Sequence, residues 1–237
     1  MTVTTTEHGG TDGDPSDDGG AAVEAHATGH RETRQERHVK EHLAVWLLIS
    51  GDAVFLALEI FTWFYLRSLN TNGLWRGAQC TNAKPCTDGL GNPITHEIAK
   101  ASPWYTIVIA ALAVVGALLV VVTERSSQRQ AGRGGISAPA GLSMLVVLAA
   151  VVVQCYQFGQ LPFTTIQGAY ASTYLYFMGS TLAHLILVLF ILTGLWFRAR
   201  AGKYDHGHWF QIRIIRLFTV WVAVATCILA VVVIGFA

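Results

Sequence analysis

The first long apolar run of the chain is LAVWLLISGDAVFLALEIFTWFY, residues 43–65. It is longer than the ~20 residues that a helix needs to cross the hydrocarbon core of a bilayer. Two carboxylates interrupt it, Asp52 and Glu59. An ionisable side chain at bilayer depth costs at least ~2.5 kcal/mol, so a functional site is the first hypothesis for both residues.

Four further apolar runs follow, at about residues 104–122, 138–158, 171–197 and 217–236. The chain is 52% hydrophobic and 13% charged, whereas soluble domains carry about 25% charged residues. These features predict an all-α fold, a polytopic bundle of five transmembrane helices within residues 37–237. Residues 1–36 contain almost no large apolar side chain, which predicts a disordered polar tail.

The Lys and Arg residues indicate how the predicted helices are oriented, because cytoplasmic loops carry an excess of them. Of the 16 Lys and Arg, all but four lie in the tail, after the second run, or after the fourth run, where Arg213 and Arg216 are counted as loop residues. The four on the other side are Arg67, Arg76, Lys84 and Lys100. The sequence therefore predicts a cytoplasmic N-terminus and an external C-terminus. A formal charge of only +1 argues against a nucleic-acid partner,.

The ends of the predicted helices carry two further patterns. Pro103 and Pro139 are expected at helix starts, where a missing N–H does no harm. Five Trp residues lie near the predicted ends, as in an aromatic belt at the membrane interface: Trp46, Trp63, Trp104, Trp196 and Trp209.

Cys80 and Cys86 flank a turn-forming Pro in the loop assigned to the outside, where a disulfide can persist,. Two loop cysteines are also compatible with a metal site, although two thiolates without a nearby His make a poor one. We favour the disulfide and predict no metal.

Haem held within a bilayer needs axial ligands such as His or Met on helices. Only His184, of the nine His in the chain, lies deep in an apolar run. One deep His does not suffice for a bis-His haem. We therefore expect no redox cofactor bound by this chain and no catalytic residue in it.

Asp52 and Glu59 are seven residues apart, which places them near one face of a helix, about 10 Å apart along its axis. A carboxylate in lipid takes up a proton or finds a partner. The two therefore either relay protons or form hydrogen bonds with Ser50, Thr62 or another helix. A small proton-coupled transporter that uses both carboxylates and His184 stays open as an alternative.

His184 follows a polar segment on the fourth run, which predicts an interior or interfacial face that contacts lipid or a partner. His184 either forms a structural hydrogen bond or is coupled to Asp52. The polar cluster consists of Tyr170, Ser172, Ser180 and Thr181.

Residues 170–174, YASTY, and 179–184, GSTLAH, resemble subunit III of the haem–copper terminal oxidases. That family typically reads Tyr-Gly-Ser-x-Phe and then Gly-x-His-x-x-His at the same spacing, so Thr181 stands where the first His is expected. Residues 46–55, WLLISGDAVF, are similar to the family's Trp helix with its buried carboxylate, at Asp52. The last helix departs from the family, because only Trp221 remains of its opening Trp-His-Phe-Val-Asp region.

The resemblance implies a divergent, five-helix bacterial subunit III in the plasma membrane. Such a subunit is an accessory, non-redox chain that packs against catalytic subunit I and other subunits of a cytochrome c or quinol oxidase. Subunit I carries the haem and copper and reduces oxygen to water. Subunit III stabilises it, supports proton uptake and holds structural phospholipid in a cleft. A related subunit is associated with nitric oxide reductase, and this remains an alternative.

Overall fold

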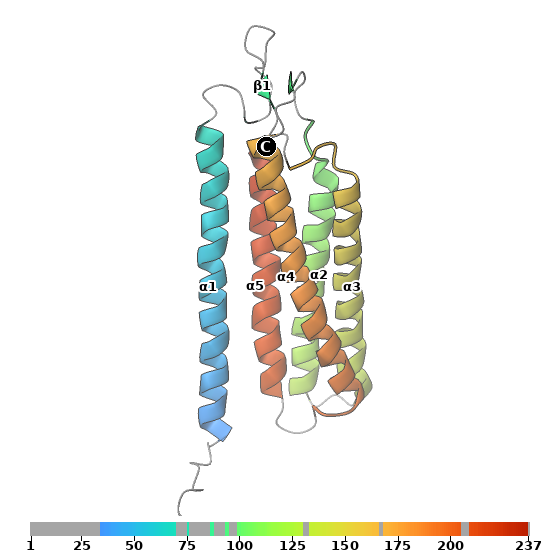
Figure 1. Ribbon diagram of the computed structural model, residues 1–237. Coiled ribbons are helices and arrows are strands. Elements are labelled where there is room, and N and C mark those ends of the chain that lie inside the picture. The colour runs from blue at the N-terminus through green and yellow to red at the C-terminus, as the bar shows by residue number, and fades with distance from the viewer. Residues whose placement is uncertain are drawn as a thin grey trace, which may run out of the picture. The chain divides into compact units, whose positions relative to one another are not determined.

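The computed structural model describes residues 34–69, 75, 86–87, 93–94, 99–129, 133–165, 168–204 and 209–236. The chain divides into two compact units, Met1–Arg37 and His38–Ala237, and all contacts described below belong to the second. Five helices make up most of it (Figure 1): α1 Arg34–Ser68, α2 Pro103–Gln128, α3 Arg133–Gly159, α4 Ala169–Arg200 and α5 Trp209–Gly235. Each is long and apolar enough to cross a membrane, which confirms the predicted all-α fold.

Between α1 and α2 in the sequence, two short strands pair antiparallel, β1 Cys86–Thr87 and β2 Pro93–Ile94. They place Cys86 opposite Ile94 in the register. Nothing about the predicted Cys80–Cys86 disulfide follows from this pairing, because Cys80 and the side chain of Cys86 lie outside the described residues.

Several helices extend beyond the predicted apolar runs. α1 begins at Arg34, inside the segment predicted as a disordered tail, and residues 1–33 lie outside the described part of the chain. α5 begins at Trp209 rather than near 217, so Arg213 and Arg216 are helical residues and not loop residues. An apolar run marks only the part of a helix within hydrocarbon, and the same helix continues into the polar headgroup region.

The two prolines behave differently from each other. Pro103 is the first residue of α2, as predicted. Pro139 lies inside α3, so its prediction as a helix start is wrong. The missing N–H of Pro139 removes a bond to the carbonyl four residues earlier, which belongs to the first turn of α3. The helix therefore continues in both directions from this proline.

Helices α2 to α5 form a closely packed bundle in which α2 packs against α3 and α5, and α4 packs against α3 and α5. Small residues let α2 and α3 approach each other, as is common between membrane helices. Ser143 of α3 donates a hydrogen bond of 2.9 Å to the carbonyl of Gly116 in α2. The core of this bundle includes Ile109, Ala113, Val120, Val147, Leu185 and Leu192.

We predict that Gly116→Leu separates α2 from α3. A Cβ at Gly116 would lie 2.8 Å from Cγ2 of Val147, closer than side chains approach one another. Overpacking of this kind costs about 1–3 kcal/mol, and thermal unfolding in detergent measures it. Gly194→Leu is the matched control, because a Cβ there meets nothing within 4 Å. Equal melting temperatures for the two variants would contradict the prediction.

α1 is the least enclosed of the five helices, and most of its large apolar side chains are exposed. Near its C-terminal end, Trp63 is fully buried. The ring of Trp63 meets Trp75 edge-on at 5.0 Å and stacks on Phe177 of α4 at 5.2 Å between centroids. Trp63 is therefore a core residue, and its assignment to an aromatic belt is wrong because a loop residue and α4 cover it. Trp46 and Trp104 are exposed.

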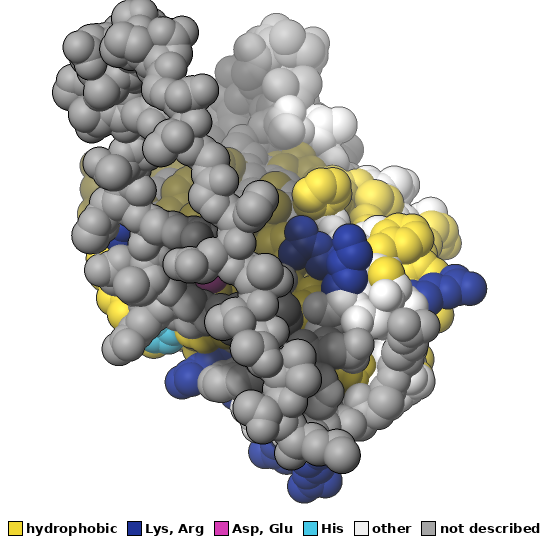
Figure 2. Space-filling model, turned by 90° about the horizontal axis from the view of Figure 1, so that it is seen from below, with side chains coloured by type: hydrophobic (Ala, Val, Ile, Leu, Met, Phe, Trp, Pro, Cys, Tyr) yellow, Lys and Arg dark blue, Asp and Glu magenta, His cyan; other side chains and the backbone are white. Residues whose placement is uncertain are grey.

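Basic side chains gather where α1 begins and α4 ends. Figure 2 looks onto this end and shows Lys and Arg side chains distributed over it. Among the described residues, the opposite end has only Arg67, at the end of α1, and Lys100, before α2. The Lys and Arg at or near the basic end whose side chains the structure describes are Lys40, Arg125, Arg129, Arg198, Arg200, Lys203, Arg213 and Arg216.

Candidate functional site

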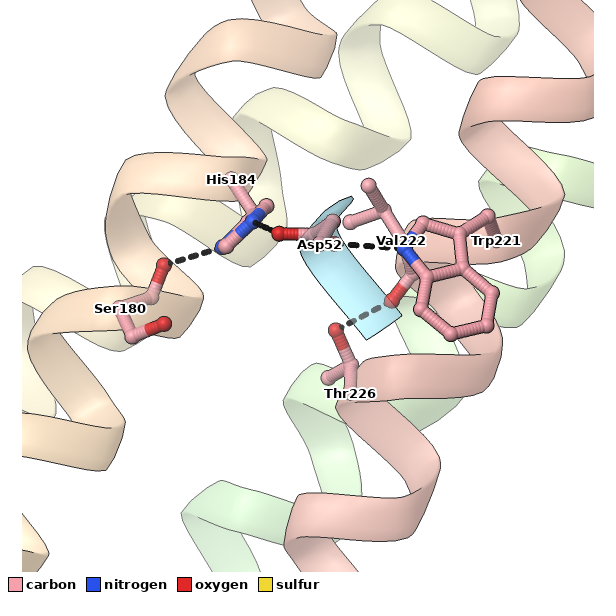
Figure 3. Close-up of polar contacts among 6 residues, drawn as sticks. All are labelled: Asp52, Ser180, His184, Trp221, Val222 and Thr226. Carbon is pink, nitrogen blue, oxygen red and sulfur yellow. Dashed lines mark hydrogen bonds and ion pairs between the residues drawn. The ribbon is translucent and has the colours of Figure 1, made fainter. Parts of the chain in front are cut away.

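Asp52, in the middle of α1, contacts two other helices (Figure 3). Its Oδ1 lies 2.7 Å from Nε2 of His184 in α4. Its Oδ2 accepts a hydrogen bond of 2.5 Å from Nε1 of Trp221 in α5. The Asp52 and His184 side chains are 15% and 24% exposed. One carboxylate therefore links α1 to both α4 and α5.

The partners of His184 determine where its protons lie. Nδ1 is 2.8 Å from the carbonyl oxygen of Ser180, one turn earlier on α4. A carbonyl oxygen only accepts hydrogen bonds, so Nδ1 must carry a proton. Nε2 and Asp52 Oδ1 must then share one proton, because two bare lone pairs would repel each other at 2.7 Å,.

The Asp52–His184 pair has no net charge wherever that proton lies. It is either an imidazolium beside a carboxylate or a neutral imidazole beside a carboxylic acid. Transfer of an isolated charge into a low-dielectric medium is very costly, and ionisable groups in membranes therefore pair with one another. The pairing explains how both Asp52 and His184 can lie inside membrane-spanning helices without the cost of an isolated charge.

Glu59 lies two turns after Asp52 on α1, and it is 3% exposed. Both carboxylates line one small cavity, together with Ser180 and His184 of α4. The prediction that the two acids share a helix face is therefore confirmed. Oε1 of Glu59 has no hydrogen-bond partner among the described residues.

A wider groove borders the same pair. It has a volume of about 840 Å³ and is lined by α1, α4 and the segment before α4. Apolar side chains, including Phe55 and Leu175, form much of its wall, and Ser172 and Thr165 add hydroxyl groups. Asp52 and His184 line both the groove and the small cavity.

The structure brings only part of the predicted polar cluster of α4 to the site. Ser180 lines both the cavity and the groove beside Asp52, and Thr181 lines the cavity. Ser172 lies in the groove and donates to the carbonyl of Thr165 at 2.6 Å. Tyr170 is 1% exposed and packs against Trp63 and Trp75 in the aromatic cluster near the end of α1. The 32-residue α4 is long enough to carry these residues past different neighbours.

Sequence reasoning missed the Glu124–Arg216 pair between α2 and α5 and two other polar features of the interior. One is Trp221, which it noted for the family resemblance but not as a partner of Asp52. The other is a buried amide network, in which Gln157 of α3 donates to the Tyr174 hydroxyl at 2.7 Å and to the Thr106 hydroxyl at 3.3 Å. Two Gln residues three positions apart in an apolar run, Gln154 and Gln157, were the available signal.

The site contains no cluster suited to a metal ion: over the described ranges, no three His, Cys, Asp or Glu side chains come together in a suitable group. Cys155 and Cys227 are free thiols on α3 and α5. Comparison with protein-family models and with curated proteins finds no match for this chain.

Proposed function

We propose that this chain is an accessory, non-redox subunit III of a bacterial respiratory haem–copper oxidase. The observation that carries the proposal is the Asp52–His184 pair between α1 and α4. The resemblance places the family's buried carboxylate at Asp52 and the second His of its fourth-helix motif at His184. These two residues are 132 positions apart in the chain, and the resemblance alone did not require them to touch.

In this proposal the partner subunit I carries the haem and copper and reduces oxygen to water. The chain described here packs against subunit I in the plasma membrane and stabilises it. Asp52 and His184 hold a proton inside the membrane domain without net charge. A site that supports proton uptake must be able to do this. The chain itself supplies no haem or copper ligand in this mechanism.

The groove between α1 and α4 supports a role in holding phospholipid. Its volume of about 840 Å³ falls within the range of ~300–1,000 Å³ that is usual for small-molecule sites,. Its apolar wall suits acyl chains, while the hydroxyl groups of Ser172 and Thr165 suit a more polar part of the lipid. An acyl chain in the groove would also cover the exposed side of the Asp52–His184 pair.

We further propose that the basic end of the bundle faces the cytoplasm. Lys and Arg concentrate at the end seen in Figure 2, and such residues are retained on the cytoplasmic side of bacterial membranes,. With α1 starting at that end and five helices crossing, the C-terminus lies outside.

Purification of the tagged chain in mild detergent tests the proposal. We expect a large multi-helix partner to co-purify and the optical spectrum to show haem bands, with copper in the metal analysis. Asp52→Leu should reduce the yield of the haem-containing partner several-fold, whereas Ser50→Leu, an exposed position on the same helix, should not.

Two other outcomes would replace the proposal. A partner with haem and non-haem iron instead of copper would identify a nitric oxide reductase complex. A colourless, solitary chain that moves protons in liposomes would identify a small proton-coupled transporter.

A further inference from the structure

Glu59 is a buried acid that the proposed role of Asp52 and His184 does not use. Its side chain is 3% exposed, and its Oε1 has no hydrogen-bond partner among the described residues. Ser180 of α4 lines the same small cavity as Glu59. Leaving a buried polar atom unpaired costs about 1–3 kcal/mol, so the Oε1 atom needs a partner that the described residues do not supply.

The cavity beside Glu59 has the size and polarity of a water site. It has room for the centre of about one water molecule, about 10 Å³,. Glu59, Asp52, Ser180 and His184 supply polar atoms around it, and a buried water typically makes about three hydrogen bonds. Apolar side chains of α5, including Ala225 and Leu229, close the remaining wall.

The charges around the cavity determine the state of Glu59. The titratable side chains that line it are Asp52 and Glu59 of α1 and His184 of α4, and α5 contributes only Val222, Ala225, Thr226 and Leu229. Asp52 and His184 already neutralise each other, and no Lys or Arg of the described part of the chain lines the cavity. An ionised Glu59 would therefore be an uncompensated charge within the membrane domain, which is strongly unfavourable.

We propose that Glu59 is held as a neutral carboxylic acid and that one water molecule in this cavity joins it to the Asp52–His184 pair. The site then has no net charge, with one acidic proton on Glu59 and another shared by Asp52 and His184. Transfer of a proton through the water needs no redox partner and breaks no covalent bond to carbon. This inference rests on the cavity alone and does not depend on the assignment to an oxidase.

Infrared spectroscopy of the full chain in lipid nanodiscs at neutral pH tests the proposal. We expect a carbonyl band of a protonated carboxylic acid, shifted by deuterium exchange, with the intensity of one glutamic acid per chain. Glu59→Gln should abolish this band. The matched control is Glu124→Gln, because Glu124 is paired with Arg216 at 2.6 Å and should contribute only carboxylate bands. Asp52→Asn removes any acid band that comes from Asp52, and it should leave the Glu59 band in place.

Two further measurements make each part of the proposal falsifiable. Heavy-carbon labelling of glutamate carboxyl groups in the unmodified chain should shift the acid band, which tests protonation without relying on the folding of a variant. Ala225→Val fills the cavity, and the acid band should move to higher frequency as its hydrogen bond to water is lost. No glutamic acid band in the labelled chain would overturn the neutral state of Glu59. A band that Ala225→Val leaves unmoved would overturn the bridging water.

Discussion

Arg216→Met is expected to destabilise the bundle by about 3–5 kcal/mol, because it leaves a buried carboxylate without its partner. Glu124 of α2 is 2% exposed, and its Oε2 lies 2.6 Å from Nη1 of Arg216 in α5. Gln128 Nε2 is the other group near the carboxylate, 3.4 Å from Oε1. An uncharged Met at position 216 would remove the only cation that the structure pairs with Glu124 among the described residues.

Glu124→Gln, which removes the carboxylate instead of the guanidinium, should lower the free energy of unfolding by less than Arg216→Met does. The Arg216 side chain is 30% exposed, against 3% for Glu124, so after Glu124→Gln the guanidinium still reaches solvent or lipid headgroups. The double variant Glu124→Leu with Arg216→Met removes both charges and should recover most of the lost stability, since apolar replacements of a buried pair are often neutral.

Thermal unfolding of the three variants in detergent measures this order. For a chain of this size each kcal/mol corresponds to about 2–4 °C in melting temperature. The expected order is Arg216→Met lowest, Glu124→Gln intermediate, and the double variant nearest the unmodified chain. A double variant that is less stable than Arg216→Met would show that the side chains contribute through packing and not through their charges.

Asp52→Leu is expected to free α1 from α4 and α5 and to cost about 2–4 kcal/mol. The change removes two hydrogen bonds to a carboxylate, each of which contributes about 1.5–3 kcal/mol in water-soluble proteins but often less within membranes. It also leaves Nε2 of His184 and Nε1 of Trp221 without the partner that each has in the structure. α1 has few other contacts near its middle, where most of its large side chains are exposed.

Distances between spin labels on α1 and α4 report the expected separation. Cysteines at the exposed positions Leu48 and Phe190 carry the labels, after replacement of the four native cysteines, Cys80, Cys86, Cys155 and Cys227. The distance distribution should broaden and lengthen in Asp52→Leu. Asp52→Asn, which retains an acceptor for Trp221, should have a smaller effect. Ser50→Leu makes the same kind of change at an exposed position and should leave the distribution unchanged; an equally narrow distribution in Asp52→Leu would refute the bridging role.

Local sequence information was sufficient for the helices and for the face that Asp52 and Glu59 share. A helix within a bilayer satisfies its own backbone hydrogen bonds, so an apolar run of sufficient length predicts its helix without reference to neighbours. The seven-residue spacing of the two acids likewise depends only on helix geometry. Pro139 and the start of α5 were placed wrongly, because helix ends in the headgroup region are not marked by hydropathy.

The sequence by itself determined that this is a bundle of five membrane helices with acids and a histidine inside, because each of these features depends on residues within one helix. Only the tertiary structure decided which groups meet: Asp52 with His184 and Trp221, and Glu124 with Arg216. It also placed Trp63 in the interior, against Trp75 and Phe177. These contacts join helices that are far apart in the chain, and side-chain packing and charge neutralisation between helices select them after the helices have formed.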